Sequence, residues 1–379
     1  MKRIIEFVVC LILVFSVVYI KPVISSYKNP KPKNDLSIEK VKMTHKSVPY
    51  YELNTTGMAN QIGKTKEEFL KEFPNPKKRW ESYDQTEWLV YGDSVNDYYQ
   101  VEIKNHVVVS AFVLGSDVDS SPFTMNMNLV DLAEITTIFS NFNFEYGDQK
   151  YEVELTEDDM NYRPLVAFNN GTFAILHMNQ LTGKLLGIRY LDKQTLLSIM
   201  PYQMEQENHV KLTKQKDTTD FKKVDEANRE QLVTLLNLFR EKDEKKGYHV
   251  DVDLQNKANK GLEILSEKPE SIITDQDHLA DWKKMSEKQS EAILLLSDEE
   301  MLKLGKEVEL KSKKDHGVFY GPVNDVPFMV TNWYGSRFYH EEIDHKKDTT
   351  VGITFTKEKS LIFFGEEEKK QTIESSDKP

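Results

Sequence analysis

A histidine beside a tyrosine stands at a turn in the segment VTNWYGSRFYHEEIDHKKDTTVGITF, residues 330–355, and it is the first candidate for chemistry. His340 follows Tyr339 and precedes Glu341 and Glu342. Imidazole and carboxylate groups together suit zinc and similar ions. A histidine beside two glutamates is also typical of a partly exposed position outside any site. From the residues alone we expect that second arrangement for His340.

Several other chemistries are excluded by residue type. Cys10 is the only cysteine and lies in an apolar run, so the rest of the chain has no thiol nucleophile, disulfide or thiolate zinc site. The sequence lacks Gly-x-Ser-x-Gly, a phosphate-binding Gly-rich loop and His-Glu-x-x-His. The segment LTEDDM, residues 155–160, lacks the spaced oxygen ligands of a calcium loop, which favours a solvated turn or helix start.

The charge balance limits the class of partner. The chain has 50 Lys and Arg against 62 Asp and Glu, a net charge of -12. Nucleic-acid binding needs a concentrated basic surface, so we expect no nucleic-acid partner. The length of 379 residues predicts two domains in addition to an anchor.

The N-terminus predicts attachment to a membrane. An apolar run from Ile4 to Ile20 follows Lys2 and Arg3 and precedes Lys21. This pattern favours an uncleaved signal anchor or transmembrane helix over residues 1–24, with a cleaved signal peptide as the alternative. We therefore expect a single-pass protein of the cell membrane, with most of the chain outside the cytoplasm. Residues 25–54 are polar and contain prolines, which indicates an extended tether.

Residues 55–202 show the same order of elements twice. Thr65 and Glu68 form a capping pair before an apolar helix face, and strands are expected at 86–92, 98–104 and 107–115. A second helix around Leu132 precedes expected strands at 151–155, 165–168, 172–179 and 185–192. The pattern predicts an α+β domain built by duplication of one helix and an antiparallel meander.

A charged linker, 203–223, leads to a second domain at 224–366. Apolar periodicity predicts helices at 225–247, 254–265, 280–296 and 326–336, and strands at 350–355 and 360–365. The tail, residues 367–379, is too polar to form a packed structure, and we expect it to be disordered.

The first domain resembles the CAP-associated N-terminal domain, found before CAP domains in membrane-anchored proteins of Gram-positive bacteria. The resemblance rests on short segments that recur in order. They are IGKTKEEF, FPNP, EWLVY, DYYQVEIKNHVVVSAFVLG, SPF, ELTEDDMNYRPLVAF and LTGKLLGIRYLDKQTLL. That family has no assigned activity.

The second domain resembles the CAP domain, also called SCP or PR-1-like. Asn237 and Arg240 match an Asn-x-x-Arg of its first helix, and Leu254 with Ala258 matches its second. The segment 330–355 matches a late signature of the family without a gap, at Val330, Trp333, Ser336, Glu341, Ile343, Val351 and Gly352. The implied fold is an α-β-α sandwich.

The resemblance also implies a cavity, which in some members binds a divalent cation through two His and two acidic residues. The ungapped match places Tyr339 where the family has its second cavity His, and His340 one residue beyond it. Glu291 matches a cavity acid, and His278 lies near the position of the first cavity His. A phenol is a poor metal ligand at neutral pH. We therefore expect no metal site, no catalytic residue and no cofactor.

A groove in the first domain is a further candidate. Tyr98, Tyr99, Arg163 and Tyr190 could line it, although aromatic residues on strands are usually half-buried. The sequence therefore predicts a membrane-anchored, extracytoplasmic binding protein whose ligand is a protein, a peptide or an envelope component. The alternative is a metal-assisted hydrolase that uses Glu291, His278 and either Tyr339 or His340. A third possibility is that the CAP-like half is only a structural platform.

Overall fold

A computed structural model describes residues 49–83, 86–206, 220–287, 292–311 and 315–367. Five predictions lie outside the described residues in whole or in large part: the membrane helix, the tether up to residue 48, the middle of the linker, Glu291 and the tail after residue 367. Within the described ranges, no helix is long and apolar enough to cross a membrane. We call residues 49–206 the N-terminal domain and residues 220–367 the C-terminal domain.

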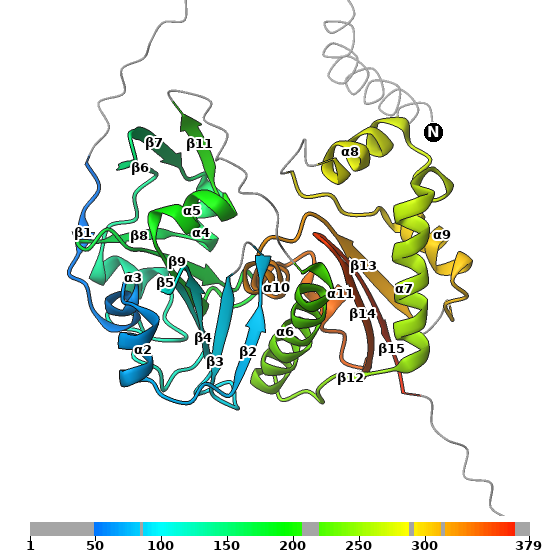
Figure 1. Cartoon of the computed structure of the whole chain (residues 1–379), viewed down its shortest axis with the longest axis horizontal. Coiled ribbons are helices and arrows are strands. Elements are labelled where there is room, and N and C mark those ends of the chain that lie inside the picture. Colours follow the sequence, from blue (N-terminus) through cyan, green and yellow to red (C-terminus); the bar gives the residue numbers. More distant parts are fainter. Residues whose placement is uncertain (1–48, 84–85, 207–219, 288–291, 312–314, 368–379) are drawn as a thin grey trace, which may run out of the picture. The chain divides into compact units, whose positions relative to one another are not determined.

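The N-terminal domain is built on a large sheet (Figure 1). Among the described residues this sheet has eight strands in the order β1-β8-β9-β10-β5-β4-β3-β2. Its strands are β1 Glu52–Leu53, β2 Lys78–Glu81, β3 Glu87–Tyr91, β4 Tyr99–Lys104, β5 Val107–Val113, β8 Leu165–Phe168, β9 Phe173–Met178 and β10 Leu185–Leu191. Two antiparallel meanders meet at their last strands, β5 and β10. The predicted tether ends inside this sheet, because β1 pairs with β8.

A smaller sheet and several short helices complete the domain. The smaller sheet, in the described part of the chain, contains β6 Asn141–Tyr146, β7 Gln149–Glu154 and β11 Gln203–Gln206. The helices are η1 Gly57–Gln61, α2 Lys66–Glu72, α3 Leu129–Ile135, α4 Glu157–Tyr162 and α5 Lys193–Ile199. LTEDDM forms the start of α4, as expected.

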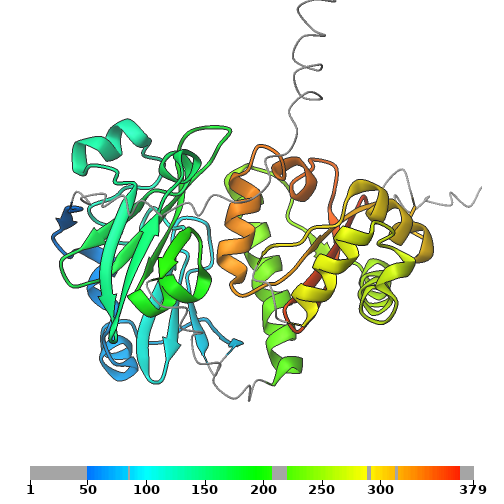
Figure 2. The ribbon, with the colours of Figure 1, turned by 90° about the horizontal axis from the view of Figure 1, so that it is seen from above.

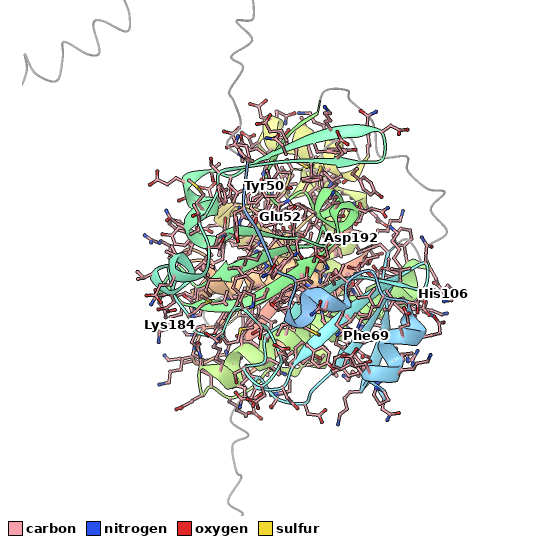
Figure 3. All side chains as sticks on the ribbon, turned by 90° about the vertical axis from the view of Figure 1, so that its left-hand side faces the viewer. Tyr50, Glu52, Phe69, His106, Lys184 and Asp192 are labelled. Carbon is pink, nitrogen blue, oxygen red and sulfur yellow. The ribbon has the colours of Figure 1, made fainter. Side chains whose placement is uncertain are left out.

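Local sequence signals account for the helix starts and the hairpin turn. Thr65 caps α2 in a capping box with Glu68, as the sequence predicts. Phe69 of α2, labelled in Figure 3, is fully buried in the domain core. Asn105 and His106 join β4 and β5 with φ angles of 49° and 63°, the twist that a two-residue hairpin turn requires.

The C-terminal domain has a sheet covered by helices on both faces. In the described residues, the sheet order is β12-β14-β15-β13. Its strands are β12 His249–Val250, β13 His316–Tyr320, β14 Thr350–Thr356 and β15 Lys359–Gly365. The helices are α6 Phe221–Lys242, α7 Val252–Glu267, η3 Pro269–Ser271, α8 Gln276–Ser286, α9 Asp298–Glu307, α10 Val326–Gly335 and α11 His340–Ile343.

Alternate residues of the central strands face the two helical layers. Ile362 and Phe364 of β15 pack in the cluster that contains α6 and α10, whereas Leu361 and Phe363 pack in the cluster that contains α7, α8 and α9. Figure 2 shows α6 and α10 on one side of the sheet and α7 on the other. This is the predicted α-β-α sandwich.

Some predicted boundaries are wrong. The helix expected over residues 280–296 instead spans Gln276–Ser286, and Leu294 in the last part of the expected range pairs with Gly321 as an isolated bridge. The long helix ends at Lys242 rather than near Gly247. Strands β2, β6 and β13 and helix α9 were not predicted from the sequence.

One apolar cluster runs through both domains. It joins Trp80, Trp88 and Phe112 of the N-terminal domain to side chains of the C-terminal domain, among them Leu235 and Met329. The described residues of both domains accordingly belong to one compact unit. A site can therefore be built from side chains of both domains.

Candidate functional site

His340 lies at the start of α11, where it faces inward. Its Nδ1 is 2.7 Å from the backbone oxygen of Tyr334, so the ring N–H at this position donates to that carbonyl. Its Nε2 is 3.6 Å from Oδ2 of Asp344, and 14% of the side chain is exposed. Its polar partners are therefore Tyr334 and Asp344, not the glutamates that follow it in the sequence.

A small charged cluster surrounds this ring. Ligand atoms of Asp243, His340 and Asp344 lie within 4.8 Å of one another, an arrangement able to hold a metal ion. Lys245 already contacts this cluster: its ammonium group is hydrogen-bonded to Oδ2 of Asp344 and lies 3.5 Å from Oδ2 of Asp243. A metal ion would have to displace that ammonium group.

Asp344 is the buried member of the cluster. Burial raises its pKa, while the hydrogen bond and charge of Lys245 and the charge of Arg240 lower it. Nη1 of Arg240 donates to Oδ1 of Asp344 at 3.1 Å and to the hydroxyl of Tyr248 at 2.9 Å. Asn237 exchanges two hydrogen bonds with the backbone of Tyr248. The two residues of the Asn-x-x-Arg motif thus hold loops in place.

Tyr339 is 38% exposed. It is the residue before α11, and its side chain makes no hydrogen bond that caps this helix. It lies close enough to Tyr320 to affect its ionisation: burial raises the pKa of Tyr320, Arg163 lowers it, and Asp325 and Tyr339 raise it further. Tyr320 lines a cleft described below, whereas Tyr339 is not among the residues of its wall.

His278 is separated from His340 by the sheet. Its Nδ1 lies 2.9 Å from Oε1 of Glu300, the residue that completes the capping box of α9. Trp282 of the same helix packs in the α7–α9 layer, whereas Tyr334, which contacts His340, packs in the α6–α10 layer. With Glu291 outside the described residues, the candidate cavity residues are not brought to one point.

The candidate groove in the N-terminal domain is also divided. Tyr98 and Tyr190 are fully buried, and their hydroxyls donate to Oε1 of Gln100 and to the backbone oxygen of Ser120. Tyr99 and Arg163 do line cavities, but two different ones. The groove prediction is therefore wrong for the two buried residues, whose side chains face packed interiors.

The cavity beside Arg163 lies between the domains. It has a volume of about 170 Å³. Its walls contain Arg163, Ser198, Ile199, Met200 and Pro201 from the N-terminal domain, and Ile293, Tyr320, Pro322, Asn324, Asp325 and Phe328 from the C-terminal domain. We call it the interdomain cleft.

Arg163 and Asp325, the two charged residues that line the cleft, are already ion-paired. Arg163 Nη2 lies 2.5 Å from Oδ1 of Asp159. Arg189 Nη2 lies 2.6 Å from Oδ2 of Asp325 and 3.0 Å from Oε2 of Glu102. Burial raises the pKa of Glu102, and the charge of Arg189 opposes that shift. The cleft wall is therefore close to electrically neutral.

Arg189, Lys245 and Asp325 take part in these clusters but were not predicted from the sequence. Asp325 had a visible signal, because an Asp before Val-Pro is a good helix cap, and its Oδ1 accepts from the backbone N–H of Phe328 at 2.7 Å. No sequence signal pointed to Arg189 or Lys245, since their ion-pair partners are distant in sequence.

Comparison with known proteins gives a family match for the N-terminal domain and a fold for the C-terminal domain. Residues 62–202 match the family described as CAP-associated N-terminal. An extracellular protein containing an SCP domain from Bacillus anthracis has a TM-score of 0.63 at 20% identity, covering 85% of this chain and 99% of that one. The chain therefore has a CAP-associated N-terminal region and the fold of an SCP-domain protein. The likeness is too broad to come from one domain alone, so it includes the fold of the C-terminal domain, which we now call the CAP domain.

Two further relatives agree with this assignment. A cysteine-rich secretory protein from Staphylococcus aureus has a TM-score of 0.67 at 19% identity, covering 85% of this chain and 95% of its own. The uncharacterized membrane protein YlbC of Bacillus subtilis is 28% identical over 188 residues, 50% of this chain. The match spans 54% of YlbC, about half its length.

Proposed function

We propose that the protein is a non-enzymatic binding protein of a Gram-positive cell envelope, attached to the membrane through its N-terminus and acting outside the cytoplasm. This location is supported by similar proteins that are described as a membrane protein, an extracellular protein and a secretory protein. The ligand site is the interdomain cleft, because both domains contribute its walls. Clefts at domain interfaces are common ligand sites.

The size of the cleft favours a side chain as its occupant. Small-molecule sites usually measure about 300–1,000 Å³, whereas a cavity of about 150 Å³ takes up one benzene-sized ring. At about 170 Å³ the interdomain cleft fits one large side chain of a protein or peptide partner. Such an anchor in a pocket is the usual centre of a protein interface.

The chemistry of the walls selects the kind of side chain. Arg163 and Asp325 are both ion-paired, so neither needs a charged ligand. Met200 and Ile293 are exposed apolar residues at the cleft, and Phe328 provides an aromatic wall. An aromatic or large aliphatic anchor is the best match, since it would cover these apolar surfaces without leaving a charge unpaired.

The hydrolase alternative requires a different geometry. A single metal ion would have to join His278 with Tyr339 or His340, and His278 lies in the other helical layer of the CAP domain. The Asp243, His340 and Asp344 cluster is a separate arrangement, with Lys245 already bound to it.

Photo-crosslinking of the full chain in Gram-positive membranes tests the proposal. A crosslinking amino acid placed at Met200 or Ile293 should trap one defined protein partner. The same amino acid at Leu302 is the matched control, because Leu302 is an exposed apolar residue outside the cleft. Equal trapping of that partner from Leu302, or no adduct from either cleft position, would contradict the assignment of the cleft.

A further inference from the structure

A second cavity lies entirely within the N-terminal domain. Its volume is about 430 Å³, and its walls come from η1, α2, the end of β3, the start of β4 and the loop after β5. None of its lining residues belongs to the interdomain cleft. It is large enough for a small ligand or the end of a long side chain.

One wall of this cavity is aromatic. The rings of Tyr91 and Tyr99 stack at 4.7 Å with an angle of 4° between them, and Phe73 meets Tyr99 edge-on at 6.1 Å. The hydroxyl of Tyr91 donates to the backbone oxygen of Phe73 at 3.0 Å, which holds the ring pair in place. Aromatic faces attract cations through their quadrupoles.

The rim of the cavity is acidic. Asp97, Asp117 and Asp119 are exposed there, and among the described residues no ion pair joins them to a cation. Hydrogen bonds from Ser94 lower the pKa of Asp97, so it is ionised near neutral pH. Asp119 accepts from the backbone N–H of Ser121 at 3.1 Å, which fixes its side chain. The rim therefore presents three exposed carboxylates, none of which forms an ion pair within the described residues.

A buried amide at the wall offers a further acceptor. Gln61 is 6% exposed and lines the cavity. Its Nε2 donates to Oε1 of Glu72 at 3.3 Å, whereas its Oε1 has no hydrogen-bond partner in the part of the chain that the structure describes. A buried acceptor without a donor is costly, and Gln61 places such an acceptor in the wall of this cavity.

These features favour an organic cation over a metal ion. Carboxylates that share a metal ion must converge, and in the described residues only the group of Asp243, His340 and Asp344 meets that distance limit. Aromatic rings offer no metal ligand, but they do stabilise an ammonium or guanidinium group.

We propose that this cavity binds the ammonium or guanidinium group of a lysine or arginine side chain in a peptide. The cation lies against Tyr99 and Tyr91, with Asp97, Asp117 and Asp119 around its charge. The site is independent of the interdomain cleft, so failure of one proposal leaves the other standing.

Calorimetric titration of the full-length protein in neutral detergent tests this site. The probes are acetyl-Gly-Lys-Gly-amide, its arginine counterpart, and the counterpart with ε-acetyl-lysine, which has the same shape but no charge. At least one cationic peptide should bind, and the acetylated peptide should bind at least tenfold more weakly. Binding should weaken as salt is raised, because the carboxylates lie on the exposed rim.

Two variants and a matched control locate the binding. Tyr99→Leu should weaken it roughly 3- to 30-fold, the range of a cation–aromatic contact. Asp117→Asn with Asp119→Asn should weaken it and reduce its salt dependence, and these exposed changes leave the core intact. Asp93→Asn removes an exposed charge that is paired with Lys77 and lies outside the cavity, so binding should stay within about twofold.

Three outcomes would overturn the proposal. The first is equal binding of the acetylated and cationic peptides. The second is no binding of either cationic peptide. The third is an effect of Asp93→Asn as large as that of the rim variants, because binding would then be general attraction to a chain of net charge -12.

Discussion

Asp225 on α6 carries a carboxyl group whose surroundings disfavour its charge. Its Oδ2 accepts from the backbone N–H of Lys357 at 3.3 Å, and its buried Oδ1 has no partner among the described residues. Burial raises the pKa of Asp225 to about 6, against the opposing effects of the Lys357 backbone and charge. The folded state therefore binds this proton more tightly than the unfolded state, whose Asp pKa is about 4. Its stabilising contribution is complete below about pH 4 and is lost as pH rises through 6.

Asp225→Asn should therefore stabilise the protein at neutral pH. We expect a gain of about 1 kcal/mol at pH 7, reduced from the full linkage value because the carboxyl group is partly exposed, and little change at pH 4. Urea unfolding at pH 4, 5.5 and 7 measures the difference. Asp220→Asn, at an exposed position before the same helix, serves as the control. A gain of the same size at pH 4 would show that the proton is not responsible.

Single residues were predicted unevenly. The ungapped match put Tyr339 where the family has a cavity His, and in the structure Tyr339 is the residue before α11. His340 was expected to be partly exposed beside Glu341 and Glu342, but its ring faces inward because its partners are Asp344 and the backbone oxygen of Tyr334. Sequence spacing identifies a position, whereas the direction of a side chain is set by partners that the fold brings to it.

At the scale of elements, α7 and β14 touch without room for a side chain. A Cβ added at Gly352 would lie 2.2 Å from the backbone carbon of Leu254. Gly352→Ala should therefore push the helix away from the strand and destabilise the fold by about 3 kcal/mol or more. Thermal unfolding followed by circular dichroism measures the loss.

Gly183→Ala is the control for this change. Gly183 has a φ of +66° but nothing within 4 Å of an added Cβ, so it should lose only about 1–2 kcal/mol through backbone strain. Equal losses at the two positions would mean that the contact between α7 and β14 is looser than described.

Periodic elements were predictable and short ones were not. The apolar faces of α6, α7 and α10 and the largely apolar strands β5, β9 and β10 were predicted correctly, because each buries a continuous or regularly spaced set of side chains. Strand β2 has one buried residue, Trp80, and β13 begins with half-buried positions, so neither has a clear period. Their pairing with β3 and β15 decides their structure.

At the scale of the whole molecule, a buried ion network ties the domains together. Arg189 of β10 is almost fully buried between Glu102 of β4 and Asp325 at the cap of α10, and its guanidinium lies 4.5 Å from the ring of Trp88. The surrounding apolar cluster contains side chains of both domains. The two domains should therefore unfold together, since neither keeps its core without the other.

Arg189→Met tests this coupling. The change leaves two buried carboxylates without their cation, which should cost about 3–5 kcal/mol. Hydrogen exchange followed by mass spectrometry should show faster exchange in β3 and β4 and, to the same degree, in α6 and α10. Arg229→Met, at an exposed pair with Glu226 on α6, should change stability by less than about 0.5 kcal/mol. Faster exchange confined to the N-terminal domain would mean that the CAP domain is stable alone, and the interdomain cleft would then join two independent units.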